Sequence, residues 1–347
     1  MTFSPGATDA TPPPAEPLRY PPHETATPLV SVVIPCYNSA RYLAETVESV
    51  VAQTYGRIEI IVVDDGSSDA TSEIAQSYPV RYVYQTNRGI SAARNTGIAH
   101  SEGKYVLFLD HDDRLLPNAV EAGVKVLEEN PECAIAVGEH RYIGPAGTAL
   151  GYSHKHAAGR DHYRQLLEHN FIETPCSALH RRSGLELAGG FDESVQGAED
   201  YELYLRTARR SPLITHGAPV AEYRLHEANA SGNAERMFMV SLEVLRKELP
   251  YLQGDPEKLR MYRRGIKFIQ RQFGRRLTRE LIGNRKPMNP ESRRKLDVLR
   301  RHYFTGFTAV VVSRALPANL IHKLIAVRVH PNEHARSADS CENLIVG

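Results

Sequence analysis

Residues 29 to 109 alternate between short apolar runs and segments with helical spacing, and this alternation is the strongest constraint on the fold. The apolar runs read LVSVVIPCYN, IEIIVVDD, VRYVYQT and YVLFL. Between them lie three segments typical of helices, such as ARYLAETVESVVAQ, in which apolar residues recur every three to four positions. Runs of consecutive apolar residues indicate parallel strands that are covered on both faces. We therefore expect an α/β domain with a mostly parallel sheet flanked by helices, which binds ligands beyond the carboxyl ends of its strands.

Carboxylates gather where two of these runs end. Asp64 and Asp65 close the second run, and the fourth leads to Asp110, Asp112 and Asp113. Like charges this close repel and raise one another's pKa. The second cluster therefore implies either a positively charged partner or an acidic turn that begins the next helix. Because Asp110 and Asp112 are two positions apart, they would point to the same side of an extended strand.

The net charge of +1 conceals a strongly basic C-terminal part. Residues 241 to 301 contain 18 Lys and Arg against 7 Asp and Glu, with blocks such as RRGIKFIQRQFGRR. This pattern is typical of a solvated helical face, and it could also meet a membrane surface or a phosphate-rich ligand. We expect no nucleic-acid partner, because interleaved aromatic residues and a recognised binding motif are both lacking.

Composition divides the chain into three parts. Residues 1 to 28 are rich in Pro, Ala and Thr and predict a disordered leader. We assign residues 29–235 to the α/β domain and 236–347 to a basic helical extension. The sequence has no apolar stretch of bilayer-spanning length and no signal peptide, so we expect a cytoplasmic protein. Its four widely spaced cysteines predict neither a zinc site nor disulfides.

Five motifs then occur in an order that resembles the family 2 glycosyltransferases, which have the Rossmann-like GT-A fold. Together they span about residues 30 to 226, roughly two thirds of the chain. They read SVVIPCYN, VVDDGSSD, NRGISAARNTGI, GKYVLFLDHDD and GGFDESVQGAEDYELYLR. One such motif would be a weak signal, but five in register are strong evidence.

The resemblance assigns the fourth motif to the donor diphosphate. It implies that Asp112 binds a divalent cation and that Asp110 lies nearer the sugar or ribose while also reaching the ion. Mg²⁺ or Mn²⁺ suits carboxylate oxygens and would neutralise the leaving diphosphate. A late histidine, His226, is expected to complete the metal or diphosphate site, although a lone histidine is more often structural. Arg224 beside it could bind phosphate.

The nucleotide is expected to contact the first three motifs. By the resemblance Asp65 hydrogen-bonds the base, usually uracil, and Asp64 precedes it; the alternative is that these residues shape an Asx turn or cap a helix. Pro35 and Tyr37 lie where the first run ends, and Tyr37 either packs on the base or is a core tyrosine. Arg94 could meet the diphosphate or form a salt bridge to one of the aspartates.

The fifth motif provides the acceptor side. The resemblance implies that Asp200 is the catalytic base of an inverting transfer, which takes a proton from the attacking hydroxyl. Glu199 would bind the acceptor or raise the pKa of Asp200, and Gly190 would shape the loop under the acceptor. The alternative is that both acids simply begin a helix, where negative charge is favourable.

The resulting prediction is a metal-dependent, inverting glycosyltransferase that moves a sugar from a nucleotide diphosphate, most often UDP in this family, to a hydroxyl of a glycan or lipid-linked acceptor. Surface polysaccharide synthesis at the inner face of a membrane would suit the basic C-terminal part. Two alternatives stay open. A HAD-like phosphohydrolase would use the first aspartate of FLDHDD as nucleophile, and a catalytically silent protein would only bind the nucleotide sugar.

Overall fold

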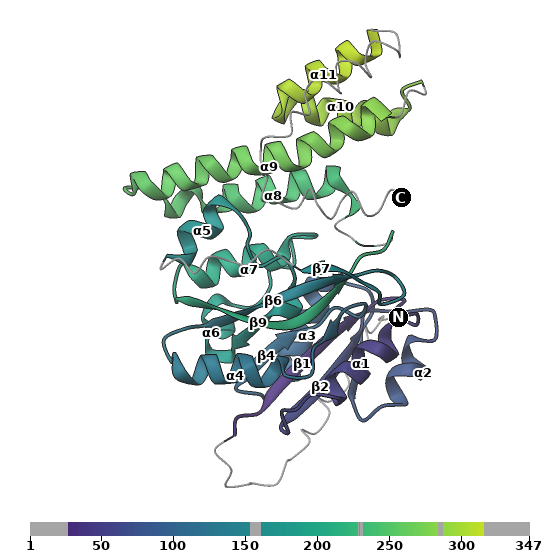
Figure 1. The fold of residues 1–347 in the computed structure, drawn as a ribbon, viewed down its shortest axis with the longest axis vertical. Helices are drawn as coiled ribbons and strands as arrows, with labels where there is room; N and C mark the ends of the chain where they lie inside the picture. The colour runs from purple at the N-terminus through teal and green to yellow at the C-terminus, as the bar shows by residue number, and fades with distance from the viewer. Residues whose placement is uncertain (1–26, 153–160, 228, 230–231, 284–286, 316–347) are drawn as a thin grey trace, which may run out of the picture.

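The computed structural model describes residues 27–152, 161–227, 229, 232–283 and 287–315 (Figure 1). The leader expected at residues 1–28 lies outside the described residues except for its last two. Cys36, Cys133 and Cys176 are buried free thiols, as the sequence predicts, and Cys341 is not among the described residues.

The alternation of strands and helices in the N-terminal half is confirmed. Four strands are joined by three helices, and the first strand is buried at every position because β1 lies in the middle of the parallel sheet. These elements are β1 (Val30–Cys36), α1 (Leu43–Val51), β2 (Ile58–Asp64), α2 (Thr71–Gln76), β3 (Arg81–Tyr84), α3 (Ile90–Ala99) and β4 (Tyr105–Phe108).

The second half of the sheet is mixed rather than parallel. The strand order is β3-β2-β1-β4-β8-β6-β9-β5, with β7 paired to β6. β8 runs antiparallel to both β4 and β6, whereas β9 is parallel to β6. The elements here are β5 (Arg114–Leu115), α4 (Ala119–Glu129), β6 (Ile135–Ile143), β7 (Ala149–Tyr152), α5 (His162–Glu168), β8 (Ala178–Arg181), α6 (Arg182–Ala188), α7 (Glu199–Ala208) and β9 (Leu213–Arg224).

Four helices form a layer beyond the sheet (Figure 1). They are α8 (Ala234–Glu248), α9 (Pro256–Gly283), α10 (Pro290–His302) and α11 (Phe304–Ala315). One hydrophobic core joins Tyr201 of α7 to Phe238 of α8, Leu277 of α9 and Leu299 of α10. The helical extension therefore packs on the α/β domain without a break in the core. Across the described part of the chain, every helix is too short or too polar to span a bilayer.

Candidate active site

Three strand ends meet at one edge of the sheet. β1 lies between β2 and β4 and is parallel to both, with Cys36 opposite Asp64 and Val33 opposite Phe108. The residues that follow these strands therefore face the same space beyond the sheet, where an open α/β fold binds its ligands. The three strand ends that were expected to surround the ligand therefore lie at the same edge of the sheet.

The loop after β1 is fastened to the loop after β2. Asn38 adopts a left-handed conformation with φ of 51°, and its side chain accepts a hydrogen bond from Ser68 N at 2.9 Å. Tyr37, one residue earlier, has 52% of its surface exposed, which excludes the alternative of a core tyrosine. Pro35 is instead buried within β1, opposite Val63. Tyr37 is therefore the residue of this loop that is free to pack on a ligand.

The acidic pair after β2 is buried and fully bonded within the protein. Asp64 accepts hydrogen bonds from Ser67 N at 2.8 Å and from the Tyr82 hydroxyl at 2.7 Å. The first of these closes an Asx-type turn, the alternative that the sequence leaves open.

Asp65 is bonded even more extensively than Asp64. Its carboxylate accepts bonds from the backbone N–H groups of Arg88 and Gly89, both at 2.8 Å, and from the Gln85 amide at 2.7 Å. It therefore holds the loop that leads into α3.

The acidic cluster after β4 is a turn, which corrects the expectation of an extended strand. β4 ends at Phe108, and Asp113 N donates to the Asp110 carbonyl at 3.0 Å. The carboxylates of Asp110 and Asp112 consequently meet different partners. Asp110 receives a bond from Arg94 at 2.7 Å, whereas Asp112 lies 2.8 Å from Nε2 of His226. Burial, the largest influence, raises the pKa of Asp112, but the hydrogen bond with His226 and the charges of His111 and His226 together lower that pKa below its usual value.

Asp113, which the sequence analysis gave no separate role, anchors this turn. Its side chain is completely buried and accepts bonds from Arg224 N at 2.9 Å, Thr174 at 3.3 Å and Cys176 at 3.4 Å. Burial, followed by the charges of Asp112 and Asp110, holds the pKa of Asp113 well above its usual range. No local sequence signal separates it from its acidic neighbours, because its partners lie more than 60 residues away.

Arg224 supports the same turn, and the expectation that it could bind phosphate is wrong. Its side chain is fully buried, and each of its three guanidinium nitrogens donates within the protein. The acceptors are the carbonyls of Asp112 and Pro145 and the carboxylate of Glu45. Arg224 is therefore a structural cation, and its complete burial keeps it out of contact with a ligand.

Arg94 connects the donor end of the site to the acceptor end. Its guanidinium, 1% exposed, donates to Asp110 at 2.7 Å and to Glu199 at 2.8 Å. The salt bridge that the sequence left as one alternative is thus present, and it is doubled. Because Glu199 begins α7, this buried cation places the turn after β4 beside the N-terminus of that helix.

Asp200 is the carboxylate most suited to accept a proton. Its side chain is partly exposed, and it accepts a hydrogen bond from Tyr201 N at 2.7 Å. Burial, and next the negative charge of Glu199, raise its pKa to about 7, although the charge of Arg94 opposes this shift. A general base works best when its pKa lies near the operating pH. The expectation that Glu199 raises the pKa of Asp200 agrees with this geometry.

Gly190 shapes the loop before α7. Its φ of +70° is left-handed, and an added Cβ would lie 2.8 Å from Oδ1 of Asn95. The same Asn95 oxygen accepts a hydrogen bond from Phe191 N at 2.8 Å. Only glycine fits this close approach, which ties the loop to α3.

The side chains that could hold a divalent cation are fewer than the sequence suggested. Within the described ranges, no group of three His, Cys, Asp or Glu residues is placed to hold a metal ion. At this site Asp112 and His226 form an adjacent oxygen and nitrogen pair, with 13% and 12% of their side chains exposed. Asp110 is directed to Arg94 instead. Two protein ligands still fit an ion that is held mainly by substrate phosphates, as Mg²⁺ often is.

Comparison with known proteins identifies relatives of this chain. Residues 31–187 match the family described as glycosyl transferase family 2. An uncharacterized glycosyltransferase of Rickettsia prowazekii is 34% identical over 218 residues, which cover 60% of this chain and 67% of the relative. A chondroitin synthase of Escherichia coli is 33% identical over 193 residues, or 54% of this chain and 27% of the synthase.

Solved structures share the fold at lower identity. Staphylococcus aureus TarS 1–349 in complex with UDP-GlcNAc has a TM-score of 0.58 and 20% identity, covering 81% of each chain. A mannosyltransferase of Pyrobaculum calidifontis in complex with GDP-Man and Mn²⁺ has a TM-score of 0.54 and 20% identity, covering 84% of this chain and 87% of that one.

The fold and the site together define an enzyme of the GT-A class. More specifically, the chain belongs to glycosyltransferase family 2 and is a glycosyltransferase. This membership removes the phosphohydrolase alternative, in which Asp110 would be the nucleophile.

Proposed function

We propose that this enzyme transfers a sugar from a UDP-sugar to a hydroxyl of a glycan or lipid-linked acceptor, with inversion at the anomeric carbon and with the help of a divalent cation. The observation that carries the proposal is the pair of bonds made by Arg94. They join the aspartate turn at the end of β4 to the start of α7, and so place a donor-binding turn beside a candidate base. Relatives named as polysaccharide synthases and structural neighbours that contain nucleotide sugars support the same class of reaction.

Asp200 acts as the base in this proposal. It takes the proton of the acceptor hydroxyl while that oxygen forms a bond to the anomeric carbon. The bond from the anomeric carbon to the diphosphate breaks, and its electron pair stays on the phosphate oxygen. A single carboxylate opposite the leaving group is sufficient for an inverting transfer. Arg94 and Glu199 position this end of the site.

The remaining predicted residues serve the donor. Tyr37 is exposed at the crevice and packs on the base, while Asp64 and Asp65 hold the loops around it. Asp110, oriented by Arg94, contacts the sugar or the ribose. Asp112 and His226 would hold Mg²⁺ or Mn²⁺, which when bound neutralises charge on the departing diphosphate.

A donor panel tests the proposal. UDP-glucose, UDP-GlcNAc, UDP-galactose and GDP-mannose are titrated into the wild type and Asp112→Asn, with Mn²⁺, Mg²⁺ or EDTA. We expect one donor to bind with metal, and its affinity to fall at least about tenfold in EDTA or in Asp112→Asn, because a charge-assisted contact is lost. The control is Glu291→Gln, an exposed carboxylate of α10. If no donor binds, the proposed function is wrong. If a donor binds equally well with and without metal, the turn after β4 is structural and the silent alternative returns.

We also propose peripheral contact with an anionic membrane through α9. Arg263, Lys267, Arg271 and Arg275 are exposed and recur every four residues on the face opposite the buried Gly265, Ile269 and Leu277. Among the described residues these four cations have no ion-pair partner. Each basic residue near an anionic surface contributes about 1 kcal/mol of attraction. This placement would bring a lipid-linked acceptor to an enzyme on the cytoplasmic side.

Vesicle sedimentation tests the membrane contact. The wild type should sediment with phosphatidylglycerol vesicles but not with phosphatidylcholine vesicles, and salt should release it. A variant with all four cations changed to Gln should remain in the supernatant. A matched variant with Arg293, Arg294, Arg300 and Arg301 of α10 changed to Gln controls for net charge. Equal sedimentation of the two variants would count against α9 as the contact.

A further inference from the structure

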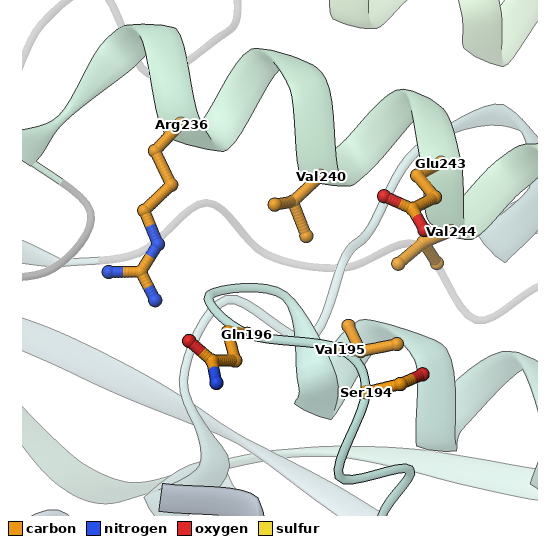
Figure 2. A pocket seen from close by; sticks show the side chains of 7 residues that line it. All are labelled: Ser194, Val195, Gln196, Arg236, Val240, Glu243 and Val244. Atoms are coloured by element: carbon orange, nitrogen blue, oxygen red, sulfur yellow. The ribbon is translucent and has the colours of Figure 1, made fainter. Parts of the chain in front are cut away.

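A cavity of about 270 Å³ lies beside the start of α7, outside the crevice at the strand ends. Figure 2 shows that its walls come from the loop before α7 and from one face of α8. The lining residues are Ser194, Val195, Gln196, Arg236, Val240, Glu243 and Val244. Ser194, Val195 and Gln196 belong to the fifth sequence motif, whereas the four lining residues of α8 lie outside all five motifs.

Arg236 is the distinctive residue of this cavity. Its side chain extends from α8 toward the loop that carries Gln196 (Figure 2). It lies against Gly197, where an added Cβ would be 3.1 Å from Nε of Arg236. Gly197 has a φ of +106°, so the backbone of the loop adopts a left-handed conformation at the residue that lies against Arg236. Across the described part of the chain, the exposed Arg236 guanidinium has no carboxylate partner.

The rest of the lining suits a sugar ring. Val240 offers a partly exposed apolar surface to the C–H face of a ring, whereas Val195 and Val244 are buried in the core, and the Gln196 amide can bond the ring hydroxyls. Glu243 lies seven residues after Arg236 on the same helix, about 10 Å along the axis. The cavity therefore has a cationic end and an anionic end.

The cationic end lies against the loop that leads into α7, the helix that carries the candidate base. Gly197, which Arg236 covers, donates its N–H to Glu199 at 2.7 Å, and Asp200 is the next residue. A group bound at Arg236 is therefore held beside the turn that places the base. An acceptor whose hydroxyl meets Asp200 can extend from there along α8.

We propose that this cavity is an acceptor subsite and that Arg236 selects acceptors whose sugar carries an anionic group, either a carboxylate or a phosphate. The inference rests on the proposed transferase function. An exposed guanidinium without a counterion recognises carboxylate or phosphate oxygens through paired N–H donors. Glu243 repels such a group from the far end and so fixes the orientation of the ring.

Three matched probes test this assignment: p-nitrophenyl β-D-glucoside, the corresponding glucuronide and the glucoside 6-phosphate. Their binding is measured by calorimetry on the full chain in the presence of UDP and Mn²⁺. We expect the wild type to bind at least one anionic probe about tenfold or more tightly than the glucoside, as a charge-assisted bond implies. The preferred probe tells carboxylate from phosphate.

Two variants test which residues cause the preference for an anionic probe. Arg236→Gln should remove the preference while leaving glucoside binding unchanged, and Glu243→Gln should strengthen binding of the anionic probe. Arg263→Gln, which removes an exposed arginine of α9, controls for net charge. Equal binding of all three probes, absence of binding by both anionic probes, or an unchanged preference in Arg236→Gln would overturn the proposal. UDP binding, measured in the same samples, reports on the donor site separately, so failure of the proposed function is distinguishable.

Discussion

Two pairs of adjacent carboxylates in this protein look alike in sequence and differ in physical state. Asp64 ends β2 and Asp65 follows it, whereas Glu199 and Asp200 begin α7. In the first pair, both carboxylates accept hydrogen bonds from surrounding N–H and O–H groups. In the second pair, Arg94 neutralises only Glu199 directly, and the pKa of Asp200 rises to about 7 through burial and the neighbouring charge.

The difference comes from partners that are distant in sequence. Hydrogen-bond donors that point at a carboxylate stabilise its charged form. The same hydrogen bonds hold the surrounding loops in place. A carboxylate beside another acid, with a single backbone bond, is held ready to take up a proton. Adjacent acids in a sequence therefore do not specify a role; the number of donors around each oxygen does.

Asp200→Asn tests the difference between the two carboxylate pairs most directly. The amide keeps the shape of the side chain but cannot accept the hydroxyl proton, so we expect transfer to fall by about 10² to 10⁴. Donor affinity should stay within about twofold, because the role proposed for Asp200 is to contact the acceptor and not the donor. Transfer is measured by release of UDP with the donor that the panel identifies. Turnover close to that of the wild type would show that another group is the base.

Removal of Arg94 should have the next largest effect. Arg94→Met leaves the carboxylates of Asp110 and Glu199 without their shared cation in a buried position. Loss of one partner of a buried ion pair costs about 3–5 kcal/mol of unfolding free energy. Urea denaturation measures this loss. Arg94→Lys, which retains one charge but not the two-sided geometry, should recover part of it, and a loss below about 1 kcal/mol would mean that Arg94 does not join the two ends.

Sequence patterns predicted the parallel half of the fold well because their signals are local. The strands β1, β2, β3 and β4 and the helices between them follow from apolar periodicity alone. The turn after β4 was one of the alternatives that the sequence left open. Its support was beyond such reasoning, because Arg224 N bonds Asp113 from 111 residues further along the chain. The contact of Asp112 with His226 was anticipated only through family resemblance.

Because Asp65 holds the surrounding loop through hydrogen bonds, we expect its substitution to lower stability, but by less than the substitution of Arg94. In Asp65→Asn an NH₂ group replaces one carboxylate oxygen. In the wild type both oxygens accept hydrogen bonds from the backbone N–H groups of Arg88 and Gly89, so the new NH₂ group would place one donor against another. An unsatisfied buried donor costs about 1–3 kcal/mol, so unfolding free energy should fall by that amount. Glu193→Gln, an exposed carboxylate in an ion pair with Arg88, serves as the control. Equal stability of the two variants would argue that Asp65 is free for the nucleotide base.

The pH dependence of transfer is the finest test of the difference between the two pairs. Because the folded pKa of Asp200 is about 7, the base is protonated below that pH, and kcat/KM should rise as pH increases through about 7. In Glu199→Gln a negative charge that raises this pKa is gone, so the rise should move to lower pH. Asp65→Asn should move the midpoint far less, since Asp65 is not among the groups with the largest effects on the pKa of Asp200. Rates measured from about pH 5 to 9 separate these outcomes, and an unmoved midpoint in Glu199→Gln would place the titrating base elsewhere.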